Sequence, residues 1–477
     1  MAVVGGLSTF KGGHYFSNFE GRPKAGIRLL APPGRVAVPL RQRGFVRGEH
    51  AKRWAEPKAL VAAGDAVKVG QIIARDDDAL CSPVHAPISG KVAAVESRPH
   101  PFGGASQVVV IEGDGKDEWV ELAPRAESLA ALGPEELGRV LYEAGVADLG
   151  LEGFPTPYHS SLAAPGSVKR LVVNAINTEP YVEGEDDLLY EEFDKFVGGI
   201  KALRAALGNV EVHVGIGWNR PRLIEALQDS VPQEWCIVHP LKNKYPQGED
   251  EVLLRTILEL RVPAGGTASQ VGCLVVDVQT AVAAYEAVFE GRPLVERVVS
   301  LAGSAMQQPA NVRVRVGTAL GDLVKLKEAG TTVLGGVMRG VAVDDMDAAS
   351  VLRDTKAVVA LKHPRKALNA VSELGFRRDS FTHVYLSLPG LTKIADVGLH
   401  GMERACVKCG YCFDVCPQNL APITIAEYAG SERLEDAKAL DMAACVECGL
   451  CTYVCPSKIP VMSQIQDGKR AALEEEG

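Results

Sequence analysis

The sequence predicts a multidomain protein that combines α/β and α+β domains. Its 477 residues are enough for about three domains of ordinary size. Strand-like and helix-like segments alternate through residues 170–293, which indicates a Rossmann-like α/β domain. Short alternating runs with turn dipeptides fill residues 59–95, and two matching cysteine quartets occupy residues 406–456. These observations predict a β module, a central α/β domain and a small cysteine-rich domain, in that order.

The cysteine-rich segment spells one spacing twice. Residues 406–417 read CVKCGYCFDVCP and residues 445–456 read CVECGLCTYVCP, so each half is C-x2-C-x2-C-x3-C-P. In two-cluster ferredoxins of this spacing, three cysteines of one half bind one 4Fe-4S cluster and the fourth binds the other. The sequence therefore predicts one cluster on Cys406, Cys409, Cys412 and Cys455, and a second on Cys445, Cys448, Cys451 and Cys416. Structural zinc favours two separated C-x2-C pairs and disulfides favour small secreted domains, so both alternatives are disfavoured.

Composition excludes several classes of protein. A formal net charge of −9 disfavours general nucleic-acid binding. No apolar run reaches the roughly 18 residues that span a bilayer, and the first residues lack the basic start and apolar centre of an export signal. We therefore expect a cytoplasmic protein whose contact with the inner face of the cell membrane would be peripheral and made through partners. The three remaining cysteines are expected to be buried free thiols: Cys81, Cys236 and Cys273.

The N-terminal β module is expected within residues 59–112. The turn dipeptides Gly64-Asp65 and Ser89-Gly90 separate short alternating runs, and residues 107–112 read as a closing strand. The stretch resembles the barrel-sandwich hybrid fold of biotinyl and lipoyl domains, which carry a modifiable lysine in one hairpin. The corresponding residues here are Asp76, Asp77, Asp78 and Ala79. We therefore expect a β module without a swinging arm.

Periodicity gives the remaining elements. Helices are expected at residues 134–147, in a segment that ends at residue 206, and in a segment that begins at residue 220. Strands are expected at residues 211–218, 235–241 and 311–317. A helix and a turn should follow the first quartet, and a short helix should follow the second. The expected domains are residues 1–125 with the hybrid module, 126–308 with the α/β fold, 309–350 with a β-grasp (SLBB-like) fold, 351–402 as a connection, and 403–477 with a two-cluster ferredoxin-like fold.

With these segments in view, the chain resembles the RnfC family, the iron-sulfur flavoproteins of the Rnf electron transport complex, a ferredoxin:NAD oxidoreductase. The resemblance is carried by GDAVKVGQ, APISGKV, GFPT, NAINTEPYV, KYPQGE, YEAVFEGRPLVERVV, VRVRVGT and the cysteine quartets. The central part is similar to the NADH-oxidising flavoprotein subunit of respiratory complex I. The resemblance covers most of the chain, and KYPQG and the quartets are its most specific parts.

The resemblance implies an FMN or NAD(H) site. In the family, a glycine-rich loop wraps the FMN phosphate, because backbone N–H groups can cradle an anion. The residues implied here are Gly150, Gly153, Phe154, Thr156, Asn174, Glu179 and Lys244. The chain departs from the family pattern at Asp148, Leu151, Glu152 and Asn177. An acidic side chain repels phosphate and a Cβ disfavours positive φ, so these changes favour a site that has lost its flavin.

Two functions follow from the sequence. The first is an oxidoreductase subunit that relays electrons through two 4Fe-4S clusters, between a flavin, NAD(H) or ferredoxin site and partner subunits. The alternative is a flavin-free wiring or assembly subunit that links a separate catalytic enzyme to an electron donor. The expected partners are a ferredoxin, a flavoprotein or membrane subunits of a multisubunit complex. No catalytic residue is assigned in this chain.

Overall fold

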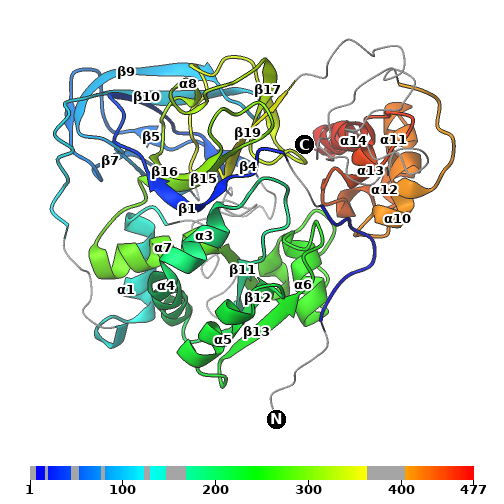
Figure 1. Ribbon diagram of the computed structural model, residues 1–477, viewed down its shortest axis with the longest axis horizontal. Helices are drawn as coiled ribbons and strands as arrows, with labels where there is room; N and C mark the ends of the chain where they lie inside the picture. Colours follow the sequence, from blue (N-terminus) through cyan, green and yellow to red (C-terminus); the bar gives the residue numbers. More distant parts are fainter. Residues whose placement is uncertain are drawn as a thin grey trace.

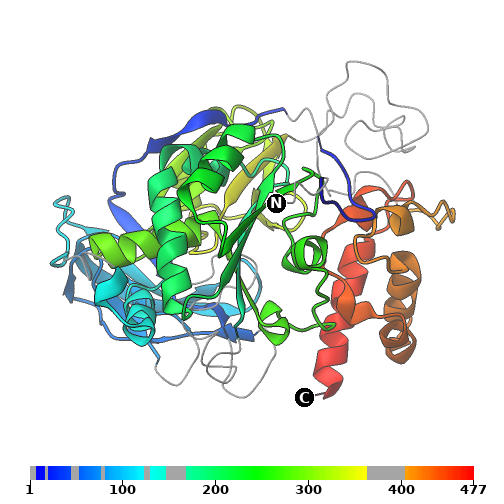
Figure 2. The ribbon, with the colours of Figure 1, turned by 90° about the horizontal axis from the view of Figure 1, so that it is seen from below.

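The computed structural model describes residues 7–16, 20–44, 53–76, 81–122, 129–146, 168–362 and 403–476. Two β-rich layers lie beside each other, an α/β domain packs below them, and a helical domain lies at one side (Figure 1). The turned view in Figure 2 shows the helical domain against the same α/β domain. Within the described part of the chain, no helix has the length and apolar character needed to span a bilayer.

The N-terminal module consists of two small sheets that face one another. Their strand orders are β2-β10-β9-β6 and β5-β7-β8. Alternate side chains point inward and form a core that includes Val38, Ile73, Val92 and Ile111. The expected closing strand lies within β10. The strands are β2 (Arg35–Pro39), β5 (Lys58–Ala59), β6 (Ala66–Val67), β7 (Ile72–Arg75), β8 (Val84–His85), β9 (Gly90–Pro99) and β10 (Ala105–Gly113), with a separate hairpin β3 (Gln42–Gly44) and β4 (Arg53–Ala55).

The central domain is a parallel sheet covered by helices on both faces, which confirms the expected α/β alternation. Its strands are ordered β13-β12-β11-β14. Leu171 and Val173 face one helical layer, whereas Val172 faces α6 on the other side. The strands are β11 (Arg170–Ala175), β12 (Glu211–Gly217), β13 (Cys236–Leu241) and β14 (Cys273–Asp277). The helices are α1 (Pro134–Glu143), α3 (Gly184–Glu191), α4 (Phe193–Ala206), α5 (Pro221–Ser230), α6 (Asp250–Leu258) and α7 (Val278–Tyr285).

A six-stranded mixed sheet connects the N-terminal module to the α/β domain. Its order is β1-β16-β15-β19-β17-β18. Strand β1 falls inside the range expected for the N-terminal module, but it pairs in parallel with β16, almost three hundred residues away. Such a distant pairing leaves no local pattern in the sequence. The elements are β1 (Lys24–Leu29), β15 (Glu296–Ala302), β16 (Ala310–Arg315), α8 (Leu320–Leu323), β17 (Gly330–Leu334), β18 (Val341–Val343) and β19 (Ala357–Lys362).

The C-terminal domain is built from two similar halves. In each half a short helix follows a glycine with positive φ, Gly410 at 80° and Gly449 at 78°. The last helix is longer than expected, because its apolar residues pack into the core of this domain from Val461 as far as Ala472, and these tertiary contacts stabilise the added turns. The helices are α10 (Tyr411–Val415), α11 (Pro422–Gly430), α12 (Leu434–Ala439), α13 (Leu450–Tyr453) and α14 (Val461–Glu476).

The C-terminal domain shares a hydrophobic core with the rest of the protein. Tyr181 and Tyr245 of the α/β domain pack in one cluster with Val446, Leu450 and Tyr453. Helix α6 contacts the end of the first cysteine quartet. Its Arg255 guanidinium donates to the carbonyl oxygen of Pro417 and, at 2.6 Å, to the side chain of Gln418. Apolar packing and these hydrogen bonds together fix the cysteine quartets against the α/β domain.

Candidate redox sites

Four cysteines from both quartets surround one small cavity. Cys445, Cys448 and Cys451 line it together with Cys416, the last cysteine of the first quartet. Burial raises the pKa of Cys448, and the neighbouring thiolates of Cys445 and Cys416 raise it further. We call these four cysteines the inner site. The structure thus brings together the four residues that the crossed spacing predicts.

The other four cysteines form the outer site: Cys406, Cys409, Cys412 and Cys455. Burial raises the pKa of Cys412 to about 11, and Cys409 and Cys455 contribute to the rise. The pKa of Cys455 is raised by burial and by the charges of Cys409 and Cys406. Cys455 therefore lies among the cysteines of the first quartet, as the crossed spacing requires.

Both sites share hydrogen bonds from the backbone to cysteine sulfur. The Lys408 N–H donates to Cys406 Sγ in the outer site, and the Glu447 N–H donates to Cys445 Sγ in the inner site, each at 3.4 Å. Hydrogen bonds to the cysteine sulfurs are among the features that tune a bound iron-sulfur cluster.

The two sites differ in exposure. Cys448 and Cys451 of the inner site are buried, whereas Cys409 of the outer site is exposed. Val407 and Phe413, beside the outer site, are also exposed. A cluster in the inner site would be enclosed by protein, and one in the outer site would lie next to solvent.

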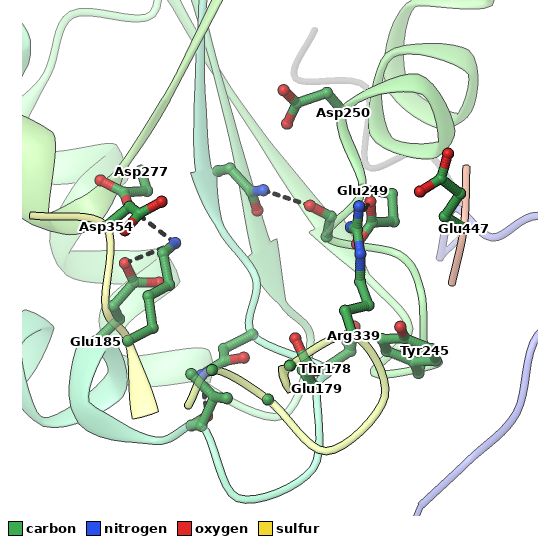
Figure 3. A pocket seen from close by; sticks show the side chains of 18 of the residues that line it. Thr178, Glu179, Glu185, Tyr245, Glu249, Asp250, Asp277, Arg339, Asp354 and Glu447 are labelled. Atoms are coloured by element: carbon green, nitrogen blue, oxygen red, sulfur yellow. Dashed lines mark hydrogen bonds and ion pairs between the residues drawn. The ribbon is translucent and has the colours of Figure 1, made fainter. Parts of the chain in front are cut away.

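A larger cavity of about 470 Å³ opens at the carboxyl ends of β11 and β14. The chain runs from β11 outward to β12 and β13 and then returns to place β14 on the opposite side of β11. This reversal creates a crevice beyond the ends of β11 and β14, which is where open α/β sheets bind ligands. Asn174 near the end of β11 and Ile176 directly after it line the cavity. Asp277 at the end of β14 lines it too and is labelled in Figure 3. Its volume suits a cofactor-sized molecule.

Glu179 is the most informative acid in the cavity wall. Burial raises its pKa to about 7, although the nearby charge of Arg339 acts in the opposite direction. Its Oε1 accepts a hydrogen bond from the Met338 N–H at 3.4 Å. A Cβ at Gly336 would lie 1.7 Å from the same oxygen, so glycine is needed there to let the carboxyl group reach its position. Glu179 therefore changes charge near neutral pH inside the cavity.

Three partly buried ion pairs lie in two parts of the cavity wall, and Figure 3 labels Arg339 and the acids Glu249, Glu185 and Asp277 that take part in them. In one part Arg339 pairs with Glu249. In the other, Lys356 Nζ lies 3.0 Å from Glu185 and 2.8 Å from Asp277. Sequence reasoning missed all five residues. The sequence offers little to mark them, because Arg339 and Lys356 come from the mixed sheet, far along the chain from the strands they meet.

The residues predicted for a flavin site separate into three groups. Asn174 and Glu179 line the cavity, and the Asn174 side-chain amide donates to the Gly248 carbonyl oxygen at 2.7 Å. Lys244 is not among the lining residues: its ammonium group donates to the carbonyl oxygen of Phe10 and lies 4.3 Å from the centre of the Phe10 ring. The predicted loop residues lie outside the described part of the chain: Gly150, Gly153, Phe154 and Thr156.

The fold and these sites define a two-cluster iron-sulfur protein with a flavoprotein-type α/β domain. Comparison with known families agrees. Residues 8–116 match the RnfC barrel sandwich hybrid domain, residues 141–286 the Nuo51 FMN-binding domain, and residues 405–459 a 4Fe-4S dicluster domain. These matches confirm the expected N-terminal module, α/β domain and two-cluster domain.

The chain belongs to the RnfC family of ion-translocating oxidoreductase complexes. It is 32% identical to the RnfC-type protein of the proton-translocating ferredoxin:NAD(+) oxidoreductase complex of Clostridium ljungdahlii, over 91% of this chain and 87% of that protein. It is 29% and 32% identical to the corresponding proteins of the ion-translocating oxidoreductase complexes of Vibrio cholerae and Klebsiella pneumoniae, and spans about half of their lengths, 52% and 54%. A chain of an NAD+-reducing [NiFe]-hydrogenase superposes on 74% of this chain with a TM-score of 0.47 and 14% identity.

Proposed function

We propose that this protein is the electron-relaying subunit of an RnfC-type oxidoreductase complex, and that electrons pass through two 4Fe-4S clusters in its C-terminal domain. The observation that carries the proposal is the crossed arrangement of the two cysteine quartets. Cys416 lies with the second quartet and Cys455 with the first. Neither a zinc site nor disulfide bonds would require the last cysteine of each quartet to lie beside the other quartet.

The proposed cluster ligands are Cys416, Cys445, Cys448 and Cys451 for the inner cluster and Cys406, Cys409, Cys412 and Cys455 for the outer. Each bound cluster would take up and release one electron at a time. The protein supplies burial and hydrogen bonds to sulfur, such as the Leu420 N–H to Cys416 Sγ at 3.4 Å. Both influence the potential at which a cluster accepts its electron.

We propose that the mixed sheet is an SLBB-like β-grasp unit. The hairpin of β15 and β16 is antiparallel, β15 runs parallel to β19, and β17 returns antiparallel to β19. Central parallel strands flanked by antiparallel neighbours are the arrangement of a β-grasp sheet. The unit then begins at about residue 296 and includes β19, so it extends on both sides of the 309–350 range expected from sequence.

For the cavity, we propose FMN as the ligand, held by Asn174, Glu179 and the loop that contains Gly150, Gly153, Phe154 and Thr156. Three facts support this proposal: the position at the sheet reversal, the volume, and the match of residues 141–286 to an FMN-binding domain. When bound, FMN exchanges two-electron and one-electron redox chemistry. Lys244 would contribute only through the segment it fixes, since its ammonium group already contacts Phe10.

A second candidate is a flavin-free subunit that connects a separate enzyme to an electron donor. The cavity wall favours it, because the described lining residues include seven carboxylates and only two cationic groups, Arg339 and Lys356. This excess of negatively charged side chains repels a phosphate group. Asn177 also lines the cavity where the family pattern has a carboxylate, and its amide donates to the Val182 carbonyl oxygen.

In either case the proposed partners are the other redox subunits of a multisubunit complex, including a ferredoxin, a flavoprotein or membrane subunits. The relatives' names describe ion-translocating complexes of this kind. We propose a cytoplasmic location, peripheral to the inner face of the membrane through those partners.

One experiment separates the candidates. The chain is purified anaerobically, and iron, sulfide and released FMN are quantified per protein before and after incubation with FMN. The electron-relay proposal expects about eight iron and eight sulfide. One FMN per chain supports the flavoprotein, and eight iron with no FMN after incubation supports the flavin-free subunit. Fewer than about five iron, even after reconstitution, would overturn the two-cluster proposal.

A further inference from the structure

Tyr245 belongs to both redox sites. Its ring lines the large cavity and is 2% exposed. Its hydroxyl donates a buried hydrogen bond of 2.7 Å to the backbone carbonyl oxygen of Cys448, an inner-site cysteine. No comparable link to the outer site is found among the described residues of the cavity wall. The cavity and the inner site are therefore neighbours, and Tyr245 connects them directly by a hydrogen bond.

The wall between the two spaces is thin. Glu447 and Met462 line the large cavity and also the small cavity of the inner site. Glu447 lies directly before Cys448 in the chain, and Met462 comes from the first turn of α14. One layer of residues therefore separates a ligand in the large cavity from a cluster in the inner site.

The N-terminal segment 7–16 holds Tyr245 in place. The His14 N–H donates to the Tyr245 carbonyl oxygen at 2.8 Å, and the Tyr245 N–H donates to the His14 carbonyl oxygen at 2.9 Å. The adjacent Gly13 N–H donates at 2.8 Å to the carbonyl oxygen of Val415, the residue directly before Cys416. The ring of Phe16 packs edge-on against Tyr245, with ring centres 5.8 Å apart. One short segment thus fixes the tyrosine and the inner-site cysteine relative to each other.

We propose that Tyr245 is a positioning residue that couples the inner cluster to the cavity, and that the inner cluster is therefore the one that exchanges electrons with a redox group bound there. The outer cluster, next to solvent, then serves the partner protein. This inference rests on the proposed function. Each exchange oxidises one group by one electron and reduces its neighbour by one electron, so no further reactant is needed.

The hydrogen bond gives the proposal a measurable consequence. The Tyr245 hydroxyl directs its hydrogen toward the Cys448 carbonyl, so its dipole favours additional negative charge on the inner cluster. Hydrogen bonds and dipoles near a cluster raise its reduction potential in this way. Removing the hydroxyl should lower the potential of the inner cluster and leave that of the outer cluster unchanged.

The test is an EPR-monitored redox titration of the anaerobic full chain with Tyr245→Phe. A Cys409→Ser variant identifies the outer-cluster signal, and Tyr142→Phe, which removes a hydroxyl from a buried tyrosine on α1, serves as the matched control. We expect a more negative midpoint potential for the inner cluster only, and no shift in the control. Replacing Tyr245 by 3,5-difluorotyrosine, a stronger donor, should shift the same potential in the opposite direction.

The outcomes distinguish the two proposals. Equal shifts of both clusters, a shift of the outer cluster alone, or no shift in either Tyr245 variant would overturn the role of Tyr245 while leaving the relay intact. Absence of 4Fe-4S signals from the unmodified chain would instead overturn the proposed function. If Tyr245→Phe does not fold, the difluorotyrosine protein, which retains the hydroxyl, decides the question alone.

Discussion

At the scale of single residues, burial determines the charge of Glu179. Folding raises its pKa from 4.5 to about 7, so the native state binds the proton more tightly than the unfolded chain. The stability associated with the protonated form is complete below pH 4.5 and is lost as the pH rises through 7. The cavity therefore becomes more negative, and the native state less stable, across this range of pH.

Glu179→Gln should remove that pH dependence. The amide remains neutral, so we expect the variant to be more stable than the original protein at pH 8, by about 1–2 kcal/mol after allowance for water in the cavity. At pH 4.5 the two proteins should be equally stable. Thermal unfolding of the anaerobic proteins at several pH values measures the difference, and a constant difference across the range would contradict this explanation.

Cys455 provides the residue-level test of crossed ligation. Cys455→Ser should alter the EPR and Mössbauer signals of the outer cluster, whose other ligands are Cys406, Cys409 and Cys412. Cys416→Ser is the matched variant and should alter the inner cluster. If Cys455→Ser changes the inner cluster instead, the crossed assignment is wrong.

Only some residues of the candidate redox sites could be predicted from the sequence. The eight cysteines could be assigned because their ligand spacing is local, and Asn174 and Glu179 because they match the pattern of the family that the sequence resembles. Arg339, Lys356 and the Tyr245–Cys448 contact could not, because each depends on segments roughly 80 to 200 residues apart. A contact between residues far apart in the chain produces no characteristic spacing in the sequence, so it cannot be predicted from local patterns.

At the scale of elements, segment 7–16 shows how an irregular segment can hold two parts of the fold together. It forms no regular helix or strand, yet it lies between the segment around Tyr245 and the inner site. Gly12 has a φ of 78°, and a Cβ there would lie 2.6 Å from the backbone oxygen of Cys416. The fit therefore depends on glycine for both conformation and space.

Gly12→Val should loosen this attachment. Both the strained φ and the clash with Cys416 oppose the native position, so we expect faster loss of inner-cluster iron to a chelator, at least several-fold. Gly34→Ala is the control, since a Cβ at Gly34 meets no atom within 4 Å. Equal rates of iron loss in the two variants would show that segment 7–16 does not support the inner site.

The two remaining differences from the expected elements have the same cause. Strand β1 lies within residues 1–125, the range expected to contain the hybrid module, and the final helix was expected to be short. The pairing of β1 with β16 and the packing of α14 into the C-terminal core are both tertiary effects. Local periodicity correctly gave the type of most elements, and non-local packing decided where they joined and where they ended.

At the scale of the whole molecule, the arrangement is asymmetric. The inner site shares lining residues with the cavity, whereas the outer site contains the exposed Cys409. The proposed relay would therefore have one end beside the cavity and one end beside solvent, independent of the direction of electron flow.

Chemical accessibility should reproduce that order. Limited ferricyanide oxidation of the native protein should damage the outer cluster first, because Cys409 is exposed while Cys448 and Cys451 are buried. The rates, followed by EPR of the oxidised cluster products, should differ by several-fold or more. Preferential damage to the inner cluster would contradict the proposed asymmetry.

The most direct test of the central claim is a reductive titration of the anaerobically purified chain with EPR spin quantification. Two 4Fe-4S clusters predict about two unpaired spins per chain at full reduction, with the broadening that two nearby paramagnetic clusters produce. A fully iron-loaded protein that yields one spin or none, without signs of coupling, would contradict a relay through paired clusters in this chain.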